Sequence, residues 1–296
     1  MRRPYEDIRM KVKLKTYAKI NLTLNVGRPE NGFHPIDSIV TTVDLYDIIT
    51  ASKRRDDEIR FTMRGLGEFD IKQADNNAYK AAAAFRERFG TGGFDLTVNK
   101  RIAIGGGLGG SSADVAGVLR ALKKLFDVSE DVKPLADELG SDCGYLLVGG
   151  TARISGRGEK VEPAAKDLEG YAVIVYCDTG VSTKECYAAF DTLCGNSDKA
   201  DNDLAMKAIE SGDFDTLCKN VSNGLSDAAK SLNDEIGRNL AAVKELSPSA
   251  YAVTGSGSCV YALYESRELC DWAADKLRKA DMDCEVVKFV PRYKNT

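Results

Sequence analysis

The chain has 296 residues and a formal net charge of −4, with 41 Lys and Arg against 45 Asp and Glu. This length exceeds what one ordinary core fills, so we expect two domains. The basic residues are scattered among acidic ones, which argues against a nucleic-acid partner. The lack of an apolar run of about 18 residues and of a signal-peptide core argues against a membrane or an export route. These properties predict a cytoplasmic globular chain.

Strand patterns open the first half of the chain. Alternating apolar and polar residues predict strands at residues 12–14, 20–26 and 38–43, and a helix follows at 77–89. A further alternating strand, ending at Ile104, leads through a glycine-rich loop into a helix. The apolar residues of this helix recur at helical spacing: Val115, Val118, Leu119, Leu122, Leu125 and Phe126. Strands mixed with helices predict an α+β first domain.

The second half also mixes strands and helices. The apolar run at 171–176 predicts a buried strand. Helices are predicted at 204–211, 234–246 and 267–279, with strands at 250–264, broken at 255–257, and at 284–290. Helices flanked by strands suit a ferredoxin-like domain. Glycines, a proline and charges between 155 and 170 mark the boundary, so we expect domains at residues 1–165 and 166–296.

Cysteine and histidine usage argues against a zinc site. The eight cysteines form no C-x-x-C pair, and the chain has one histidine. In a chain of this length without an export signal, reduced thiols are expected. Cys143 is either a reactive thiol or a small core residue.

The glycine-rich loop is the most informative segment of the sequence. Glycine lets the backbone approach a ligand closely, and the following helix offers unpaired N–H groups and a partial positive charge. Ser111 and Ser112 stand where a helix N-cap belongs, and Asp114 lies in the first turn. The junction therefore predicts a phosphate-binding site.

Other interpretations of this loop fit less well. A Walker A loop needs a lysine before its serine, and none precedes Ser111. Gly105, Gly107 and Gly110 satisfy G-x-G-x-x-G, but a dinucleotide-binding strand is continuously apolar whereas this one alternates, as in an antiparallel sheet. A glycine-rich turn without a ligand would cost backbone entropy with no offsetting gain.

The segment G-G-G-L-G-G-S-S-A-D at 105–114 resembles the phosphate loop of the GHMP kinases, the superfamily of galactokinase, homoserine kinase and mevalonate kinase. The opening A-K-I-N-L-T-L-N-V at 18–26 and N-G-F-H at 31–34 resemble the corresponding segments of the 4-diphosphocytidyl-2-C-methyl-D-erythritol kinases. Further matches follow in family order at 43–50, 76–81, 139–142, 149–152, 158–159, 181–183 and 254–257.

The resemblance implies a two-domain GHMP kinase fold, with an N-terminal domain like domain 2 of ribosomal protein S5 and a ferredoxin-like C-terminal domain. It implies phosphorylation of a hydroxyl of 4-diphosphocytidyl-2-C-methyl-D-erythritol, with ATP and Mg²⁺, in non-mevalonate isoprenoid precursor synthesis. The partner would be this small-molecule substrate, and the enzyme a monomer or homodimer. A GHMP kinase for another alcohol, such as a sugar, homoserine or a mevalonate derivative, and a non-catalytic nucleotide sensor remain alternatives.

The resemblance also assigns the nucleotide site. It places the purine near Asn76 and Lys100, and the phosphates at Gly105, Gly106, Gly107, Leu108, Gly109, Gly110, Ser111 and Ser112. Mg²⁺ prefers oxygen ligands, and the loop hydroxyls lie beside the phosphates, so Ser112 is the expected metal ligand. Ser111 stands where the family has glycine and Ala113 where it has serine, so which serine binds the metal stays open.

Asp142 matches the catalytic aspartate of the family and Lys19 the lysine that faces it. Without the resemblance, Asp142 would be read as a helix cap or a surface carboxylate. In the alternating segment 18–26, Lys19 and Asn21 point to the same face, which is either solvent or the floor of an active site.

By resemblance, the acceptor site holds cytosine between Phe33 and Tyr187, with His34 at its edge and Asn21, Thr183 and Gly255 nearby. The chain departs from the family at several positions. Phe33 replaces tyrosine, Pro35 replaces glutamate, and Ala103 and Gly144 each replace proline. None of these changes removes a group that does chemistry.

Overall fold

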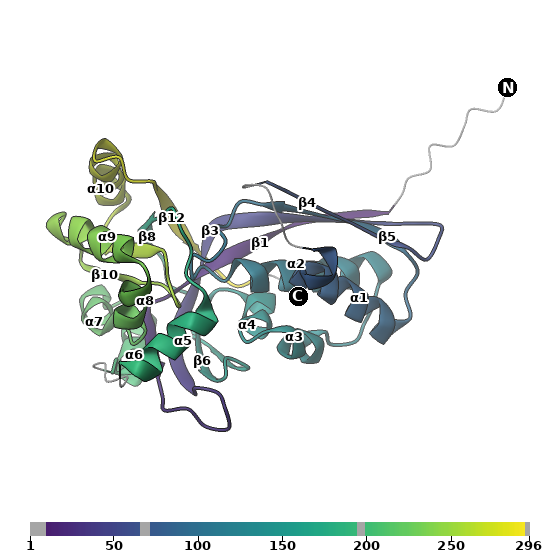
Figure 1. Ribbon diagram of the computed structural model, residues 1–296, viewed down its shortest axis with the longest axis horizontal. Helices are drawn as coiled ribbons and strands as arrows, with labels where there is room; N and C mark the ends of the chain where they lie inside the picture. Colours follow the sequence, from purple (N-terminus) through teal and green to yellow (C-terminus); the bar gives the residue numbers. More distant parts are fainter. Residues whose placement is uncertain (1–9, 66–71, 194–198, 294–296) are drawn as a thin grey trace.

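The computed structural model describes residues 10–65, 72–193 and 199–293. Its first half is a sheet with helices on one face (Figure 1). The strands are β1 (Lys11–Asn21), β2 (Thr23–Val26), β3 (Ile36–Lys53), β4 (Ile59–Gly65), β5 (Phe94–Lys100), β6 (Thr151–Gly156) and β7 (Lys160–Pro163). The helices are α1 (Asn77–Phe89), α2 (Gly110–Phe126), α3 (Lys133–Leu139) and α4 (Cys143–Val148), with a short 3₁₀ turn at Gln73–Asp75.

The long strand β3 organises this half. Its 18 residues pair antiparallel with β1, β2, β5, β6 and β12 (Cys284–Val290). The sequence pattern predicted only residues 38–43 of it, because Asp44 and Asp47 interrupt the apolar run. Asp47 is nonetheless fully buried, since the backbone N–H groups of Arg101 and Ile102 donate to its carboxylate.

The second half contains an antiparallel sheet in the order β10 (Ala250–Val253), β11 (Val260–Tyr264), β8 (Tyr171–Val175), β12. Between β8 and β10 lie α5 (Thr183–Thr192), α6 (Asn202–Ser211), α7 (Phe214–Asn220), the short β9 (Ser222–Asn223), α8 (Ser226–Leu232) and α9 (Asp234–Glu245). Helix α10 (Arg267–Lys279) connects β11 to β12. This β-α-β-β-α-β arrangement confirms the ferredoxin-like prediction.

The two halves share sheet and core. Phe289 and Val290 of β12 pair with Val43 and Thr42 of β3, and Thr23 of β2 pairs with Ser222 of β9. One buried cluster includes residues from both halves, a second mainly residues of the C-terminal half. The boundary at 165/166 stays a prediction. Within the described ranges, no helix is both long and apolar enough to cross a membrane.

Two local predictions around the glycine-rich segment were wrong. The strand expected to run to Ile104 ends at Lys100, and β5 pairs antiparallel with β3 but parallel with β4. The N-cap of α2 is Gly109, with φ 70°, so Ser111 and Ser112 lie inside the first turn. A left-handed glycine ends the loop here, so no serine side chain is needed to begin the helix.

Candidate active site

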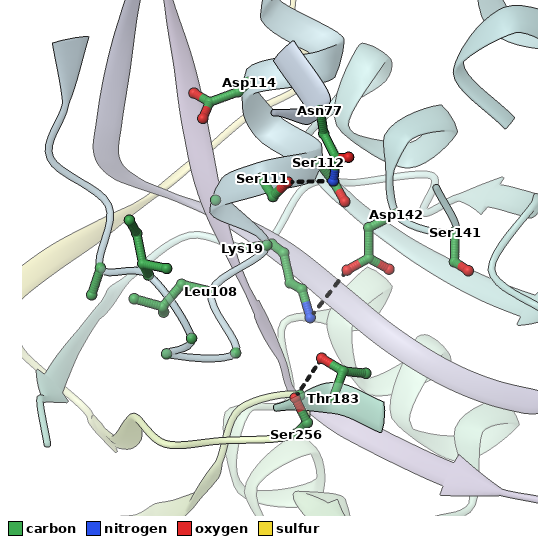
Figure 2. Close-up of a pocket in the computed structure, with 18 of the residues that line it drawn as sticks. Lys19, Asn77, Leu108, Ser111, Ser112, Asp114, Ser141, Asp142, Thr183 and Ser256 are labelled. Atoms are coloured by element: carbon green, nitrogen blue, oxygen red, sulfur yellow. Dashed lines mark hydrogen bonds and ion pairs between the residues drawn. The ribbon is translucent and has the colours of Figure 1, made fainter. Parts of the chain in front are cut away.

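A cavity of about 480 Å³ opens where the glycine-rich loop faces the second half of the chain. Its lining draws on β1, on the loop and first turn of α2, on the start of α4, and on α5 and the segment after β10. Figure 2 shows these segments converging around Lys19 and Asp142. Residues more than 200 positions apart, such as Lys19 and Ser256, therefore line one space.

The loop from Gly105 to Gly109 is fastened by main-chain hydrogen bonds. Lys19 N–H donates to the carbonyl of Leu108 (3.0 Å), and Val181 and Ser258 N–H both donate to that of Gly105 (3.0 Å each). At Gly107, with φ 72°, an added Cβ would lie 1.9 Å from the carbonyl oxygen of Thr254. Glycine is thus required there by conformation and by close packing.

The first turn of α2 is open toward the cavity. Gly109 has no side chain to cap it, so no side-chain acceptor occupies the first N–H groups of the helix. Those groups, and the positive end of the helix dipole, suit an anionic ligand. Ser112 lines the cavity, as does Ser111, whose hydroxyl accepts a hydrogen bond from Asn77 Nδ2 at 3.0 Å (Figure 2).

Lys19 and Asp142 face each other across the cavity (Figure 2). Lys19 Nζ lies 3.5 Å from Asp142 Oδ2, and the lysine is only 4% exposed. The ammonium also donates to Asn21 Oδ1, and Asn21 Nδ2 in turn donates to Ser38 Oγ (2.8 Å). The face of β1 that carries Lys19 and Asn21 is therefore a cavity wall and not a solvent surface.

Asp142 occupies the N-cap position of α4, yet its side chain makes no capping hydrogen bond. The carboxylate is turned to Lys19 and remains partly exposed in the cavity, with a side-chain exposure of 24%. It is therefore a carboxylate held beside an ammonium and still reachable by a ligand.

Lys100 and Asn76 line the cavity beside the first turn of α2, where Lys100 contacts Gly110 and Asn77, the neighbour of Asn76, contacts Ser111. The Lys100 ammonium donates to Asp47 Oδ2, Asp114 Oδ2 (2.8 Å) and the Gly110 carbonyl (3.4 Å), which accounts for its three protons. Asn76 caps α1, since its Oδ1 accepts from the N–H of Ala78 (2.9 Å). Hydrogen bonds to the protein thus hold both side chains in place.

The prediction that Asp114 lies in the first turn of the helix was wrong, because α2 begins at Gly110 and Asp114 lies beyond that turn, where it accepts a hydrogen bond from Lys100. It is 3% exposed and points away from the Lys19–Asp142 pair (Figure 2). Burial, which outweighs the attraction of Lys100, and the nearby Asp47 raise the pKa of its carboxyl above the ordinary range. No sequence signal joins Asp47, Lys100 and Asp114, because β3, β5 and α2 must be packed before the three meet.

The predicted acceptor residues are only partly brought together. Tyr187, Thr183 and Gly255 line the cavity with Asn21, and Thr183 Oγ1 lies 3.0 Å from Ser256 Oγ. His34 does not line it. Its ring centroid lies 5.0 Å from that of Tyr187, and its nitrogens face the Gly27 carbonyl (3.0 Å) and Asp191 Oδ1 (3.3 Å).

Phe33 also lies outside the lining and is 49% exposed. The guanidinium carbon of Arg157 sits 3.5 Å from the centroid of its ring, and Arg157 itself lines the cavity. Sequence reasoning missed Arg157, as it missed Asn77, Ser141 and Ser256 of the lining. The flanking Gly156 and Gly158 are the only signal that an exposed turn carries it.

Cys143 follows Asp142 but does not line the cavity. It is 1% exposed, and burial raises the pKa of its thiol to about 12. The reactive thiolate form is therefore scarce at neutral pH, which favours the core-residue alternative. All seven described cysteines are free, and Cys194 lies outside the described residues.

Comparison with known proteins identifies the architecture. Residues 76–151 match the GHMP kinases N terminal domain, and residues 205–281 match the GHMP kinases C terminal. The chain belongs to the GHMP kinase family. The first match begins at Asn76 and covers the glycine-rich loop and Asp142, and the second covers α9, β10, β11 and α10.

Relatives within the GHMP kinases are similar over most of their length. The chain is 36% identical over 270 residues to the 4-diphosphocytidyl-2-C-methyl-D-erythritol kinase of Caldicellulosiruptor saccharolyticus, covering 90% of this chain and 92% of the relative. It is 32% identical to the kinase of that name from Bacillus cereus, covering 86% and 88%. A crystal structure of 4-(cytidine 5'-diphospho)-2C-methyl-D-erythritol kinase superposes with a TM-score of 0.79 at 28% identity, covering 94% and 99%.

More distant GHMP kinases share the fold. The mevalonate kinase of L. major, solved with R-mevalonate, gives a TM-score of 0.74 at 17% identity, covering 98% of this chain and 99% of that one. The α+β fold class inferred from the sequence is thereby confirmed.

The described residues fit a magnesium ion held largely by a ligand's phosphates. In the described part of the chain no group of three His, Cys, Asp or Glu side chains could hold a metal alone. Mg²⁺ commonly keeps several waters and is bound by few protein oxygens together with substrate phosphates. The hydroxyl of Ser112, which lines the cavity in the first turn of α2, suits that mode of binding.

Proposed function

We propose that this GHMP kinase transfers the γ-phosphoryl group of ATP to a hydroxyl of 4-diphosphocytidyl-2-C-methyl-D-erythritol, in the non-mevalonate synthesis of isoprenoid precursors. The observation that carries the proposal is the Lys19–Asp142 pair, 3.5 Å apart in a cavity that also contains a glycine-rich loop and an open helix N-terminus. The similarity to 4-diphosphocytidyl-2-C-methyl-D-erythritol kinases over most of the chain supports the choice of acceptor.

The loop residues Gly105 to Gly110 and the first turn of α2 would hold the nucleotide phosphates. Asn76 and Lys100 also line the cavity, beside the first turn of α2, and would lie near the purine. Ser112 would bind Mg²⁺, which when present shields the phosphate charge during transfer. Phosphoryl transfer leaves the protein mainly to position its substrates and neutralise charge, and this arrangement does both.

Asp142 would accept the proton of the acceptor hydroxyl as that oxygen attacks the γ-phosphorus, while the bond from this phosphorus to the β,γ-bridging oxygen breaks and ADP leaves. The ammonium of Lys19 stabilises the ionised carboxylate and can polarise the same hydroxyl. Asn21 fixes Lys19 through its hydrogen bond, so the pair is held in place before substrate arrives.

Tyr187, Thr183, Asn21 and Gly255 would contact the acceptor, because they share the cavity with the Lys19–Asp142 pair. Stacking of the cytosine on Phe33 and an edge contact from His34 stay predictions. Neither side chain lines the cavity, and Arg157 covers a face of the Phe33 ring.

Consumption of ATP with a panel of alcohols tests the proposal. The panel holds 4-diphosphocytidyl-2-C-methyl-D-erythritol, methylerythritol phosphate, homoserine and mevalonate, each with and without Mg²⁺. We expect turnover with the cytidine compound only, and only with the metal. Turnover with another member of the panel would instead make the chain a GHMP kinase for a different alcohol, and no turnover with ATP binding retained would make it a sensor.

A further inference from the structure

Three cationic side chains line the cavity, and two of them are neutralised by the protein. Lys19 pairs with Asp142, and Lys100 pairs with Asp47 and Asp114. The third, Arg157, has no carboxylate oxygen within 4.0 Å of its guanidinium among the described residues. Glu159, its neighbour in sequence, accepts instead from the backbone N–H of Arg157 (2.6 Å). Arg157 is therefore the lining cation whose guanidinium N–H donors are not taken up by a carboxylate of the described residues.

The Phe33 ring packs against the Arg157 guanidinium. The ring is half-exposed, does not line the cavity, and has the Arg157 guanidinium carbon 3.5 Å from its centroid. An arginine stacked on an aromatic face keeps its planar fork oriented while its N–H groups stay free at the edge. Phe33 is thus placed to position Arg157.

The position of Arg157 identifies the end of the cavity it serves. Arg157 lies in the turn between β6 and β7. The next residue, Gly158, packs tightly on Ser141, because a Cβ added to Gly158 would lie 2.8 Å from the carbonyl oxygen of Ser141. Ser141 immediately precedes Asp142. On the other side, Phe33 adjoins His34, whose ring contacts Tyr187. Arg157 therefore lies between Asp142 and the Phe33–His34 segment, whereas Asn76 and Lys100 lie beside the first turn of α2.

We propose that the Arg157 guanidinium binds the diphosphate group of the acceptor, with Phe33 as its positioning residue. This inference rests on the proposed function, since the acceptor named there carries an anionic diphosphate between its cytidine and its alcohol. A guanidinium fork matches two phosphate oxygens at once, and charge-assisted bonds of this kind are stronger than neutral ones.

Equilibrium binding of cytidine and of cytidine diphosphate, together with steady-state kinetics, tests the assignment. The variants are Arg157→Gln, which removes the charge, and Arg157→Lys, which keeps the charge but loses the fork. Arg267→Gln is the matched control, because Arg267 also lies over an aromatic ring, that of Tyr171, but on α10 away from the cavity.

In Arg157→Gln we expect the acceptor KM and the Kd of cytidine diphosphate to rise about 10- to 100-fold, as for loss of a charge-assisted pair. The Kd of cytidine, the KM of ATP and kcat should stay within about twofold of the parent values. The acceptor KM and the Kd of cytidine diphosphate measured for Arg157→Lys should lie between those of the parent and those of Arg157→Gln. An unchanged acceptor KM overturns the inference, and a raised KM for ATP alone reassigns Arg157 to the nucleotide phosphates. An inactive parent enzyme would instead refute the proposed function, so the two failures are distinguishable.

The variant Phe33→Leu tests the positioning role. If Phe33 acts through Arg157, this variant weakens binding of cytidine diphosphate but not of cytidine, and it adds nothing in the Arg157→Gln background. An equal loss of affinity for both ligands would mean that the ring stacks on the base. That result would remove Phe33 from the proposal.

Discussion

Two parts of the cavity differ in whether main-chain or side-chain groups line them. The part of the cavity proposed to hold the nucleotide is mainly main chain: a glycine loop fastened by backbone hydrogen bonds and a helix N-terminus without a side-chain cap. The part proposed to hold the acceptor is made of side chains from segments far apart in sequence, among them Lys19, Asp142, Arg157, Tyr187 and Thr183. A phosphate can be bound by any backbone N–H groups of the right geometry, whereas a particular alcohol needs particular side chains.

A backbone site depends on few residue identities, mostly glycines, so the same kind of loop can serve kinases that act on different acceptors. The side-chain end can change one residue at a time without disturbing the loop. Substitutions at the acceptor end should therefore alter the acceptor KM or kcat, while those at the loop should alter ATP affinity.

The largest expected effect is at Asp142. Asp142→Asn keeps the shape but removes the charge, and loss of a general base lowers the rate on the order of 10²- to 10⁴-fold. ATP affinity should change little, because the ATP phosphates are proposed to bind to the loop and not to Asp142. Steady-state kinetics and calorimetric ATP binding measure both, with the exposed Asp271→Asn as control. A kcat within about threefold of the parent would make Asp142 a structural residue.

The next largest effect is at Gly107. In Gly107→Val the new Cβ would meet the carbonyl of Thr254 and the residue would be forced to a positive φ, so the loop must shift. We expect ATP affinity to fall about 10- to 150-fold, as when one or more charged hydrogen bonds are lost. Gly212→Val is the matched control, since Gly212 also has a positive φ of 78° but nothing within 4 Å of an added Cβ. Unchanged ATP affinity in a folded Gly107→Val would exclude the loop as the phosphate site.

The sequence predicts those parts of the site that are local in the chain and not those that packing brings together. Residues 105–110, the helix after them and the shared face of Lys19 and Asn21 could be recognised because they are local in sequence. The pairing of Lys100 with Asp47 and Asp114 could not, since three separate elements must pack to create it. Family resemblance supplied Asp142, which spacing alone does not distinguish from other acids. Arg157 was missed because its role depends on a turn and on contact with Phe33.

The fold shows the same limit. Helix α1, helix α10 and strand β12 were predicted with their observed bounds, because each is a periodic segment with clear ends. Strands β4, β6 and β7, and helices α3, α4, α5, α7 and α8, were not predicted. They are short or only partly buried, so tertiary packing and not local pattern decides them.

A smaller effect is expected at Tyr187, the aromatic ring that does line the cavity. Stacking of a base on an aromatic ring contributes about 1 to 3 kcal/mol, so Tyr187→Ala should lower kcat/KM for the cytidine acceptor about 5- to 150-fold. Replacing cytidine by uridine in the acceptor isolates the edge contacts, which we expect to disfavour uridine. Equal kcat/KM for the two bases would point to a GHMP kinase that does not read a base.

The smallest effect is a pH dependence of stability at Asp114. Burial first, and the Asp47 carboxylate, raise the pKa of Asp114 to about 8 in the fold, above the ordinary aspartate value. Because the pKa of Asp114 is higher in the folded than in the unfolded chain, the folded protein holds a proton that the unfolded chain releases. The resulting contribution to the free energy of unfolding is complete at acid pH and is lost as pH rises through about 8. The free energy of unfolding cannot change by more than about 1.4 kcal/mol per pH unit for one group.

Asparagine mimics the protonated carboxyl and cannot ionise, so Tm should fall less for Asp114→Asn than for the parent between pH 6 and about 9. Melting curves across that range provide the measurement, with Asp271→Asn as the exposed control, and parallel Tm profiles for parent and Asp114→Asn would mean that Asp114 is ionised beside Lys100.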